Sequence, residues 1–132
     1  MLLSMLDTDT CIHVIRDRRT ELGPRFQNEV RSLCISTIVL HELRHGAEKS
    51  DRPVYHHERV DDFSTRLKVI DFDQDAAFHA ASIKSDLQRR GQIIGPNDLL
   101  IAGHARSLGL KLITGNLREF NRVDGLRCED WL

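Results

Sequence analysis

Residues 95–105 read Gly-Pro-Asn-Asp-Leu-Leu-Ile-Ala-Gly-His-Ala, and they place one carboxylate, Asp98, at the start of an otherwise apolar helix. Pro96 suits the first turn of a helix, and Asn97 is a residue type that caps such a turn with its side-chain oxygen. The apolar residues that follow leave little polar surface, so we expect this helix to be buried on most sides and to end at Gly109. The helix dipole also favours an acid in the first turn, so Asp98 taken alone has a purely structural explanation.

Length and charge limit the classes of protein to which the chain can belong. Its 132 residues suffice for one domain, residues 1–132, with a substantial core. The formal net charge is −1, so no overall positive field attracts nucleic acid, and a local patch would have to hold any polyanion. Three widely spaced cysteines without a C-x-x-C pair indicate buried thiols in a reducing compartment. The apolar run at residues 1–6 is too short for a signal or membrane segment, so we expect a cytoplasmic protein without membrane contact.

Short apolar runs alternate with helical patterns along the chain. We expect strands at residues 2–6, 33–36, 69–72 and 110–114. We expect helices at residues 11–15, from a Thr37 cap to residue 47, at 53–67, from Asp73 or Asp75 to Gly91, and at 96–108. Strands that are apolar throughout and separated by helices indicate a parallel sheet covered on both faces. The predicted fold class is α/β, a three-layer α/β/α domain with a central, mainly parallel sheet of four to five strands.

Polar residues from distant parts of the chain follow these strands. Asp7 comes directly after the first strand and Asn116 soon after the fourth, while Glu42 lies early in the helix after the second. Asp98 opens its helix at what we expect to be the same end of the sheet. Ligands of parallel sheets bind beyond the carboxyl ends of the strands. We therefore expect these four side chains to converge on one edge of the sheet.

Converging carboxylates repel one another unless a cation or a shared proton lies between them. Mg²⁺ and Mn²⁺ take oxygen ligands and keep several waters, and they support hydrolysis of phosphodiesters. We expect Asp7 and Asp98 to hold the metal, with Glu42 bound directly or through water. Asn116 and Glu119 would place metal-bound water. These five residues are the predicted catalytic set.

Further fragments match a known pattern in their order and spacing. They lie at residues 5–8, 36–43, 46–50, 95–105, 113–120, 125–126 and 129–131. With these fragments, nearly the whole chain resembles the PIN-domain ribonucleases, and specifically the VapC-type toxins of bacterial toxin–antitoxin pairs.

The resemblance implies a magnesium-dependent endoribonuclease that cuts structured RNA, often within a tRNA anticodon loop, and so inhibits translation. It also implies a homodimer and a small antitoxin whose tail blocks the active groove. The acids of the family map onto Asp7, Glu42 and Asp98, and its late polar position maps onto Asn116, with Glu119 nearby. The chain departs from the family pattern at two positions. Asp9 stands where the family usually has asparagine, and we expect it to cap a helix; Gly115 stands where a polar residue is common.

Two motifs offer alternatives from other enzyme classes. Residues 7–10, Asp-Thr-Asp-Thr after an apolar run, match the D-x-D-x-T motif of haloacid dehalogenase-like phosphatases, whose first aspartate is a nucleophile. That fold needs a longer chain and a second late acid, and none lies near Asp98. Residues 41–45 match H-E-x-x-H, the motif that places two histidines on one helical face for zinc, but no convincing third ligand follows. A third alternative is a non-catalytic binding module, which the presence of all three acids disfavours.

Basic side chains are the candidate phosphate contacts for an RNA substrate, and only those beside the acids would matter. The candidates are Arg16, Arg18, Arg19, Lys84, Arg89, Arg90, Arg106 and Arg118. We expect His104, on the apolar helix, to be a core histidine, and Trp131 to pack as a lid on the core.

Overall fold

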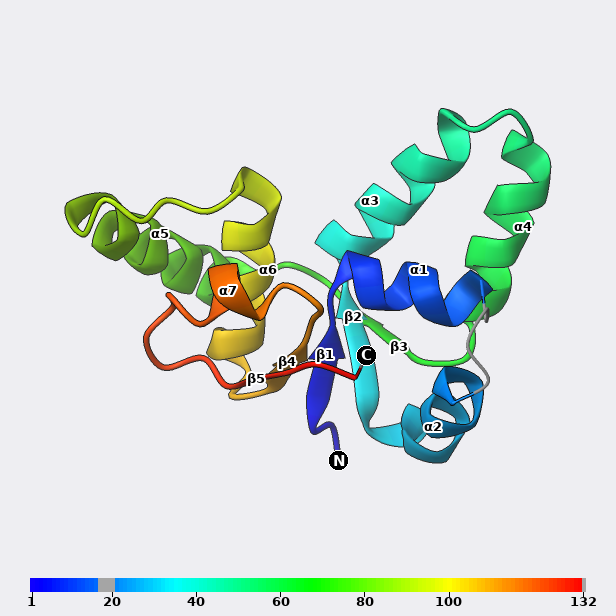
Figure 1. Cartoon of the computed structure of the whole chain (residues 1–132), viewed down its shortest axis with the longest axis horizontal. Helices are drawn as coiled ribbons and strands as arrows, with labels where there is room; N and C mark the ends of the chain where they lie inside the picture. The colour runs from blue at the N-terminus through cyan, green and yellow to red at the C-terminus, as the bar shows by residue number, and fades with distance from the viewer. Residues whose placement is uncertain (17–20, 132) are drawn as a thin grey trace.

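The computed structural model describes residues 1–16 and 21–131, and in these residues strands and helices alternate as expected (Figure 1). The strands are β1 (Ser4–Leu6), β2 (Leu33–Ser36), β3 (Lys68–Ile70), β4 (Lys111–Ile113) and β5 (Cys128–Glu129). The helices are α1 (Thr8–Arg16), α2 (Leu22–Glu29), α3 (Thr37–Glu48), α4 (Pro53–Ser64), α5 (Gln74–Arg89), α6 (Pro96–Ser107) and α7 (Leu117–Phe120), with a short 3-10 turn, η1 (Val30–Ser32).

The strands form one five-stranded parallel sheet with the order β3-β2-β1-β4-β5. β1 is the central strand, with Met5 opposite Cys34 of β2 on one side and Leu112 of β4 on the other. All residues of β1 and β2 are buried, as the apolar runs predict for strands covered on both faces. The predicted three-layer α/β/α fold is therefore confirmed.

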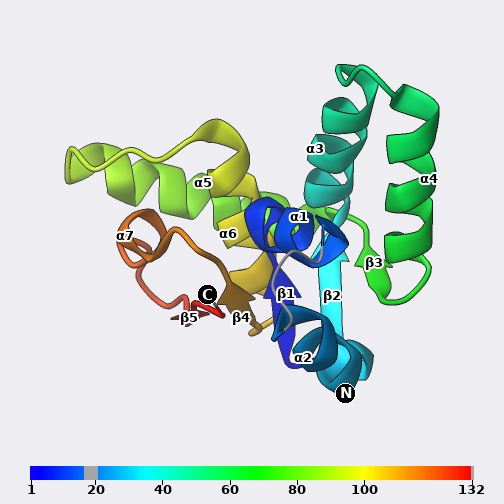
Figure 2. The ribbon, with the colours of Figure 1, turned by 45° about the vertical axis from the view of Figure 1, so that its right-hand side comes forward.

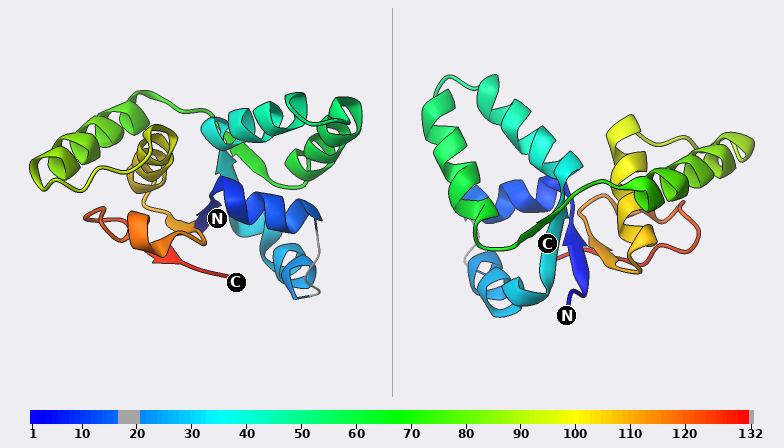
Figure 3. Two further views of the ribbon diagram at one scale, coloured as in Figure 1. Left: turned by 45° about the horizontal axis from the view of Figure 1, so that its top comes forward. Right: turned by 180° about the vertical axis from the view of Figure 1, so that it is seen from behind.

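The helices lie in two groups about the sheet. α1, α3 and α4 lie towards β2 and β3, whereas α5, α6 and α7 lie towards β4 and β5 (Figures 1 and 2). Figure 3 shows α6 beside β4 with α5 packed along its outer side. The strand order reverses between β1 and β4, because the chain returns across the sheet after β3. Such a reversal creates a crevice at the carboxyl ends of the strands, where parallel sheets bind ligands.

Two helices pack with unusually close backbones. A Cβ added at Gly103 of α6 would lie 2.5 Å from the backbone nitrogen of Ala80 in α5, so only glycine fits there. Both helices end in the same way, with Gly91 and Gly109 at φ angles of 66° and 67°. After each glycine a backbone hydrogen bond closes the last turn of the helix. The N–H of Gln92 donates to Leu87 O, and the N–H of Leu110 donates to Ala105 O. The two predicted helix stops are confirmed.

Several predicted boundaries are wrong by a few residues, and three elements were not predicted. The first, third and fourth strands are shorter than expected because only residues 4–6, 68–70 and 111–113 pair with neighbouring strands. The unpredicted elements are α2, α7 and β5. α2 buries Leu22 and Phe26, and Phe26 stacks on Phe63 of α4 with 5.4 Å between the ring centroids. No described helix has both the length and the apolar composition needed to cross a membrane.

Two predicted core residues are where we expected them. Trp131 is buried at the end of the chain, and the guanidinium of Arg25 lies 4.6 Å from its ring centroid. His104 is fully buried, accepts or donates a hydrogen bond at 2.8 Å to Ser36, and meets the ring of Phe72 edge-on. Burial lowers the pKa of His104, so the imidazole is neutral at pH 7.

Candidate active site

Asp7 lies where β1 ends and α1 begins, and its carboxylate is almost fully buried. Oδ1 accepts the backbone N–H of Thr10 at 3.0 Å, and Oδ2 accepts the hydroxyl of Thr114. Asp7 therefore caps α1 itself, and the expectation that Thr8 or Asp9 would cap this helix is wrong. Burial is the main cause of the raised pKa of Asp7, and the hydrogen bonds from the two threonines act against it.

Glu42 points from the second turn of α3 towards α1 and α6. Its Oε1 accepts the hydroxyl of Thr8 at 2.5 Å, and its Oε2 accepts the side-chain amide of Asn97 at 3.2 Å. Asn97 thus does not cap α6 as predicted; Gly95 occupies the N-cap position without a side-chain bond. Three segments of the chain therefore meet at the carboxylate of Glu42.

The expected cap of α3 is also wrong by one residue. Ser36 is the N-cap, and its hydroxyl accepts the N–H of Ile38 at 3.0 Å. Thr37 instead accepts the N–H of Phe72 at 3.1 Å and so ties α3 to the segment after β3. Both contacts fix the start of the helix that carries Glu42.

Asn116 and Glu119 lie together after β4. The side-chain amide of Asn116 donates to Glu119 Oε2 at 2.8 Å, and the Asn116 N–H donates to Thr114 Oγ1 at 2.9 Å. Because Thr114 also donates to Asp7, one threonine joins the loop after β4 to the carboxylate after β1. Sequence reasoning missed the roles of Thr8, Asn97 and Thr114. Thr8 and Asn97 stand directly beside the predicted acids Asp7 and Asp98, whereas no local signal marks Thr114.

Asp98 lies at the centre of the acidic cluster, which we define as Asp7, Glu42, Asp98 and Glu119. Partial burial, a hydrogen-bonding contact with Glu119 and repulsion by Glu119, Glu42 and Asp7 together raise the pKa of Asp98 to about 7. The predicted convergence of these residues on one edge of the sheet therefore has an electrostatic consequence. In the absence of a cation, burial and the neighbouring acids favour the protonated form of the Asp98 carboxyl.

The acidic cluster suits a hard divalent cation by its donor chemistry. All its ligand atoms are carboxylate oxygens, which Mg²⁺ and Mn²⁺ prefer, whereas no histidine or thiol lies in it. Within residues 1–16 and 21–131, no three His, Cys, Asp or Glu side chains are arranged to hold a metal ion as they stand. A site with one or two carboxylate ligands and several waters is the arrangement that Mg²⁺ usually takes in proteins.

Residues 41–45 do not form a zinc site in this structure. His41 and His45 are exposed, whereas Glu42 turns both carboxylate oxygens towards Thr8 and Asn97. Asp9 is exposed on α1, where it adds a small repulsion that raises the pKa of Asp7. The pattern at residues 7–10 therefore has one buried carboxylate and one exposed one.

A groove of about 530 Å³ lies between α1, α3 and α4. Apolar residues such as Ile12, Leu43 and Val60 line it together with Glu42. Arg59 lines it too, and its guanidinium donates to the carbonyl of Ile15, so that α4 is tied to α1. Through Glu42 the groove includes one member of the acidic cluster.

The candidate phosphate contacts divide into several groups. Arg90 and Arg106 donate to the backbone of other segments, and Arg89 bonds to Ser85 within α5. Lys84 and Arg118 are exposed. Arg16 lines the groove, and Arg18 and Arg19 lie outside the described residues.

Comparison with known proteins now places the chain in a family. Residues 4–126 match the model of the PIN domain. The chain is 47% identical over 131 residues to the tRNA(fMet)-specific endonuclease VapC of Salmonella typhimurium, covering 99% of each sequence. It is 45% identical to Ribonuclease VapC2 of Haemophilus influenzae over the full length of both. Its structure also superposes on the solved DNA-bound VapBC from Salmonella typhimurium with a TM-score of 0.96 and 47% identity, covering 100% of both chains.

These matches span essentially the whole chain and agree with the fold. They favour a ribonuclease over the phosphatase and peptidase that two short motifs suggested. The chain belongs to the PIN-domain family and, within it, to the VapC ribonucleases.

Proposed function

We propose that this protein is a magnesium-dependent endoribonuclease toxin that cleaves a structured RNA, a tRNA within its anticodon loop, and thereby inhibits translation. The observation that carries the proposal is the gathering of Glu119, Glu42 and Asp7 around the Asp98 carboxyl, whose pKa is raised by burial and by their repulsion. A partly buried group of acids with this mutual repulsion is stabilised by a divalent cation. The relatives named as a tRNA(fMet)-specific endonuclease and as ribonucleases support RNA as the substrate, and the activity proposed here is cytoplasmic.

Asp7 and Asp98 would hold the metal, with Glu42 contributing directly or through water. When bound, Mg²⁺ supplies a Lewis acid for the scissile phosphate and lowers the pKa of a coordinated water. Mn²⁺ has the same oxygen preference and would substitute for it.

The chain's own residues orient this acidic cluster. Thr10 and Thr114 fix both oxygens of Asp7, while Thr8 and Asn97 fix both oxygens of Glu42. Asn116 holds one oxygen of Glu119 and so orients this carboxylate beside Asp98, where Asn116 and Glu119 would place metal-bound water. Carboxylates held by several hydrogen bonds need little rearrangement during a reaction, and such preorganisation is the main contribution that a protein makes at such a site.

We propose further that a cognate antitoxin inhibits the enzyme by laying its tail in the groove between α1, α3 and α4. Apolar residues and Glu42 line the groove, so a segment bound there would lie against one member of the acidic cluster. Support comes from the superposition on a VapBC complex, in which a chain of this kind is bound to its partner. A homodimer, also implied by the family, is the expected oligomeric state and is checked by light scattering.

The experiment that tests this function is a cleavage assay with the purified protein on total RNA, with and without Mg²⁺. Asp98→Ala and Asp7→Ala are the test variants, and Asp75→Ala, an exposed acid in the first turn of α5, is the matched control. We expect cleavage only with metal, loss in both test variants and full activity in the control. Normal cleavage by either test variant, at an unchanged circular dichroism spectrum, would show that the site assignment is wrong.

Fragment mapping identifies the RNA and the bond that is cut. Cleavage mapped to an anticodon loop would support the tRNA proposal, and cleavage of another RNA would restrict the proposal to a ribonuclease. Release of phosphate from small esters without RNA cleavage would instead favour the phosphatase alternative.

A further inference from the structure

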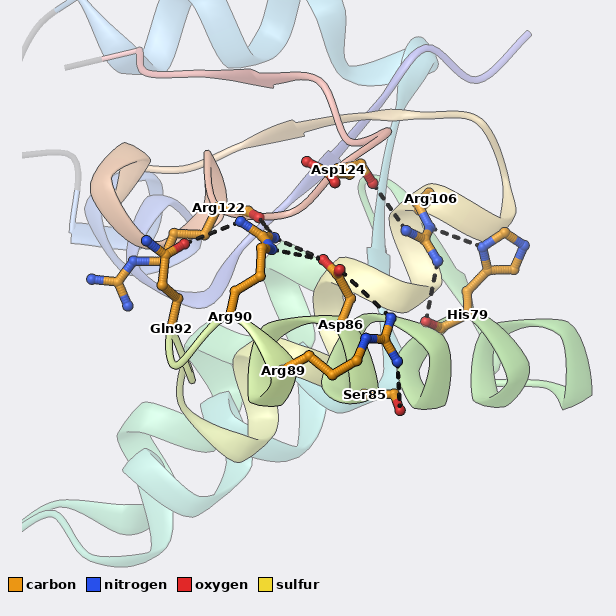
Figure 4. Close-up of polar contacts among 9 residues, drawn as sticks. All are labelled: His79, Ser85, Asp86, Arg89, Arg90, Gln92, Arg106, Arg122 and Asp124. Carbon is orange, nitrogen blue, oxygen red and sulfur yellow. Dashed lines mark hydrogen bonds and ion pairs between the residues drawn. The ribbon is translucent and has the colours of Figure 1, made fainter.

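Two arginines, Arg90 and Arg122, make a pair of contacts with the backbone of other segments (Figure 4). Arg90, at the C-terminal end of α5, donates from Nη2 to the carbonyl oxygen of Arg122 at 2.5 Å. Arg122 in turn donates from Nη1 to the carbonyl oxygen of Ile93 at 3.2 Å. We call Arg90 and Arg122 the arginine clamp. The side chain of Arg90 binds the backbone of Arg122, and the side chain of Arg122 binds the backbone of Ile93, three residues after Arg90.

The arginine clamp joins the two segments that present neighbouring acids of the cluster. Ile93 lies five residues before Asp98, in the loop that leads into α6, and Arg122 lies three residues after Glu119, just beyond α7. Asp98 and Glu119 are in hydrogen-bonding contact with each other. The clamp therefore fixes the backbone on both sides of this carboxyl pair.

The guanidinium of Arg90 is itself held in place on several sides. Asp86, one turn earlier in α5, accepts Nε at 3.1 Å and Nη2 at 2.7 Å, and Gln92 accepts Nη1 at 3.1 Å. Five donors in one rigid plane allow arginine to bridge a carboxylate, an amide and a backbone carbonyl at once, which lysine cannot do. Asp86 also neutralises the charge of Arg90, so that this side chain is a poor anchor for a phosphate.

A third arginine reinforces the same connection from the helix of Asp98. Arg106 of α6 donates from Nη1 to the carbonyl oxygen of Asp124 at 2.9 Å and from Nε to His79 of α5 at 3.0 Å. Figure 4 shows this contact on the same side of α5 and α6 as the arginine clamp. The segment after α7 is thus tied both to the loop before α6 and to α6 itself.

The positions of Asp98 and Glu119 explain why such ties matter. Asp98 lies in the first turn of α6, directly after the loop that contains Ile93, and Glu119 lies in the four-residue helix α7. Fixing the backbone before Asp98 and after Glu119 keeps the two carboxyls together. A metal ion then needs no rearrangement of the loops when it binds.

We propose that Arg90 and Arg122 are positioning residues that hold the loop before Asp98 against the segment after Glu119, and so keep the acidic cluster ready for its metal. This inference rests on the proposed metal-dependent function and deepens it. It reassigns Arg90 from a candidate phosphate contact to an internal tie.

The test compares Arg90→Ala, Arg122→Ala and the double variant with Arg89→Ala as the matched control. Arg89 is the neighbouring arginine on α5 and also pairs with Asp86, at 3.7 Å, but it is exposed and bonds only within α5. The first readout is amide hydrogen exchange of the metal-free protein, since loss of a tie opens the segments that it held. We expect amide exchange at residues 92–99 and 117–123 to be about tenfold faster than in the wild type in both test variants. In Arg89→Ala we expect the exchange rate of these residues to be unchanged.

The second readout is the Mg²⁺ concentration that gives half-maximal RNA cleavage. We expect it to rise about tenfold in Arg90→Ala and in Arg122→Ala, with the KM for RNA unchanged. The double variant should be little worse than either single variant, because both side chains close the same connection. Arg122→Lys retains one donor and should recover most of the metal affinity, whereas Arg90→Lys should not.

The outcomes separate this inference from the proposed function. Unchanged exchange in both test variants would refute the clamp, whatever the activity. A raised KM with a weaker salt dependence and an unchanged metal requirement would show that the arginines contact RNA phosphates instead. If the wild-type protein cleaves no RNA, the proposed function fails, and the exchange experiment still decides whether Arg90 and Arg122 hold the two segments together.

Discussion

The side-chain amide of Asn97 donates to Glu42 at 3.2 Å and so joins the first turn of α6 to the second turn of α3. Asn97 thereby orients an acid from another helix instead of capping its own. This contact brings Glu42 to the side of the sheet on which Asp98 lies, one residue further along α6. The Asn97 amide and the Thr8 hydroxyl together hold the carboxylate of Glu42 in this position.

Removal of that amide should impair catalysis more than folding. We expect Asn97→Ala to lower kcat about tenfold, because hydrogen bonds to charged groups contribute about 1.5–3 kcal/mol and a tenfold rate change needs about 1.4 kcal/mol. The melting temperature should change little, since Asn97 caps nothing. Cleavage rates and thermal unfolding of Asn97→Ala are compared with those of Asn28→Ala, an exposed asparagine on α2. Equal rates in the two variants would mean that Glu42 needs no orientation.

The stability of the metal-free protein should fall as the pH rises towards neutrality. The pKa of Asp98 is about 7 in the folded protein, against 3.8 for an unperturbed carboxyl. Between these two values only the folded state holds this proton, so its contribution to stability is present below about pH 4 and is lost by about pH 7. The loss is at most about 4 kcal/mol, since each pKa unit corresponds to about 1.4 kcal/mol.

Asp98→Asn removes this dependence and should raise the melting temperature of the metal-free protein at pH 8. The melting temperatures of the wild type and of Asp98→Asn are compared at pH 5 and pH 8 in the presence of a chelator. Asp75→Asn is the control, because Asp75 is an exposed acid. Added Mg²⁺ should stabilise the wild type at pH 8 and not Asp98→Asn. A wild-type melting temperature that rises steadily from pH 5 to pH 8 would contradict the assignment.

The contact between α5 and α6 should tolerate no side chain at Gly103. A methyl group there would meet the backbone of Ala80 at 2.5 Å, so we expect Gly103→Ala to destabilise the protein by about 1–3 kcal/mol. Gly46→Ala on α3 is the matched control, because a Cβ at Gly46 has no neighbour within 4 Å. That substitution should stabilise the helix by about 1 kcal/mol. Urea unfolding of the two variants should therefore move in opposite directions.

The open space around Gly46 also allows a test of the groove. Gly46 lines the groove between α1, α3 and α4, so Gly46→Phe should fill it without strain. We expect this variant to cleave RNA normally and to bind the antitoxin at least tenfold more weakly. Calorimetric titration with the antitoxin and the RNA assay measure the two effects. Wild-type affinity for the antitoxin in Gly46→Phe would place the antitoxin elsewhere.

The sequence predicted the fold well where a local pattern decides the structure. Four apolar runs became strands, and the second, residues 33–36, has the predicted bounds. The two-residue strand β5 carries too short a pattern to be read and exists only because β4 pairs with it. α2 was missed because the arginines around it obscured Leu22 and Phe26, whose burial depends on the distant Phe63.

The acids of the site were predictable from their positions after strands, but their hydrogen-bond partners were not. Thr114 and Asp7 are 107 residues apart, and nothing local in either segment indicates the bond between them. Asparagine is a residue type that often caps helices, so the sequence favoured a cap at Asn97. Only the folded chain shows that Glu42 lies within hydrogen-bonding distance of its side chain. Arg90 was misassigned for the same reason, because Asp86 and the carbonyl of Arg122 are brought to it by folding.

The order of the strands also determines when the enzyme becomes active during its synthesis. Asp7 lies on the central strand, but the strand on one side of it, β4, comes more than a hundred residues later, and β5 completes the sheet at the far end of the chain. Domains fold as units, so a nascent chain has the N-terminal acid long before it has Thr114, Asn116 and Glu119. Residues 111–129 must therefore be made before the sheet around Asp7 and the acidic cluster are complete. A partly synthesised chain that ends before Thr114 thus has Asp7 without the side chain that holds its Oδ2.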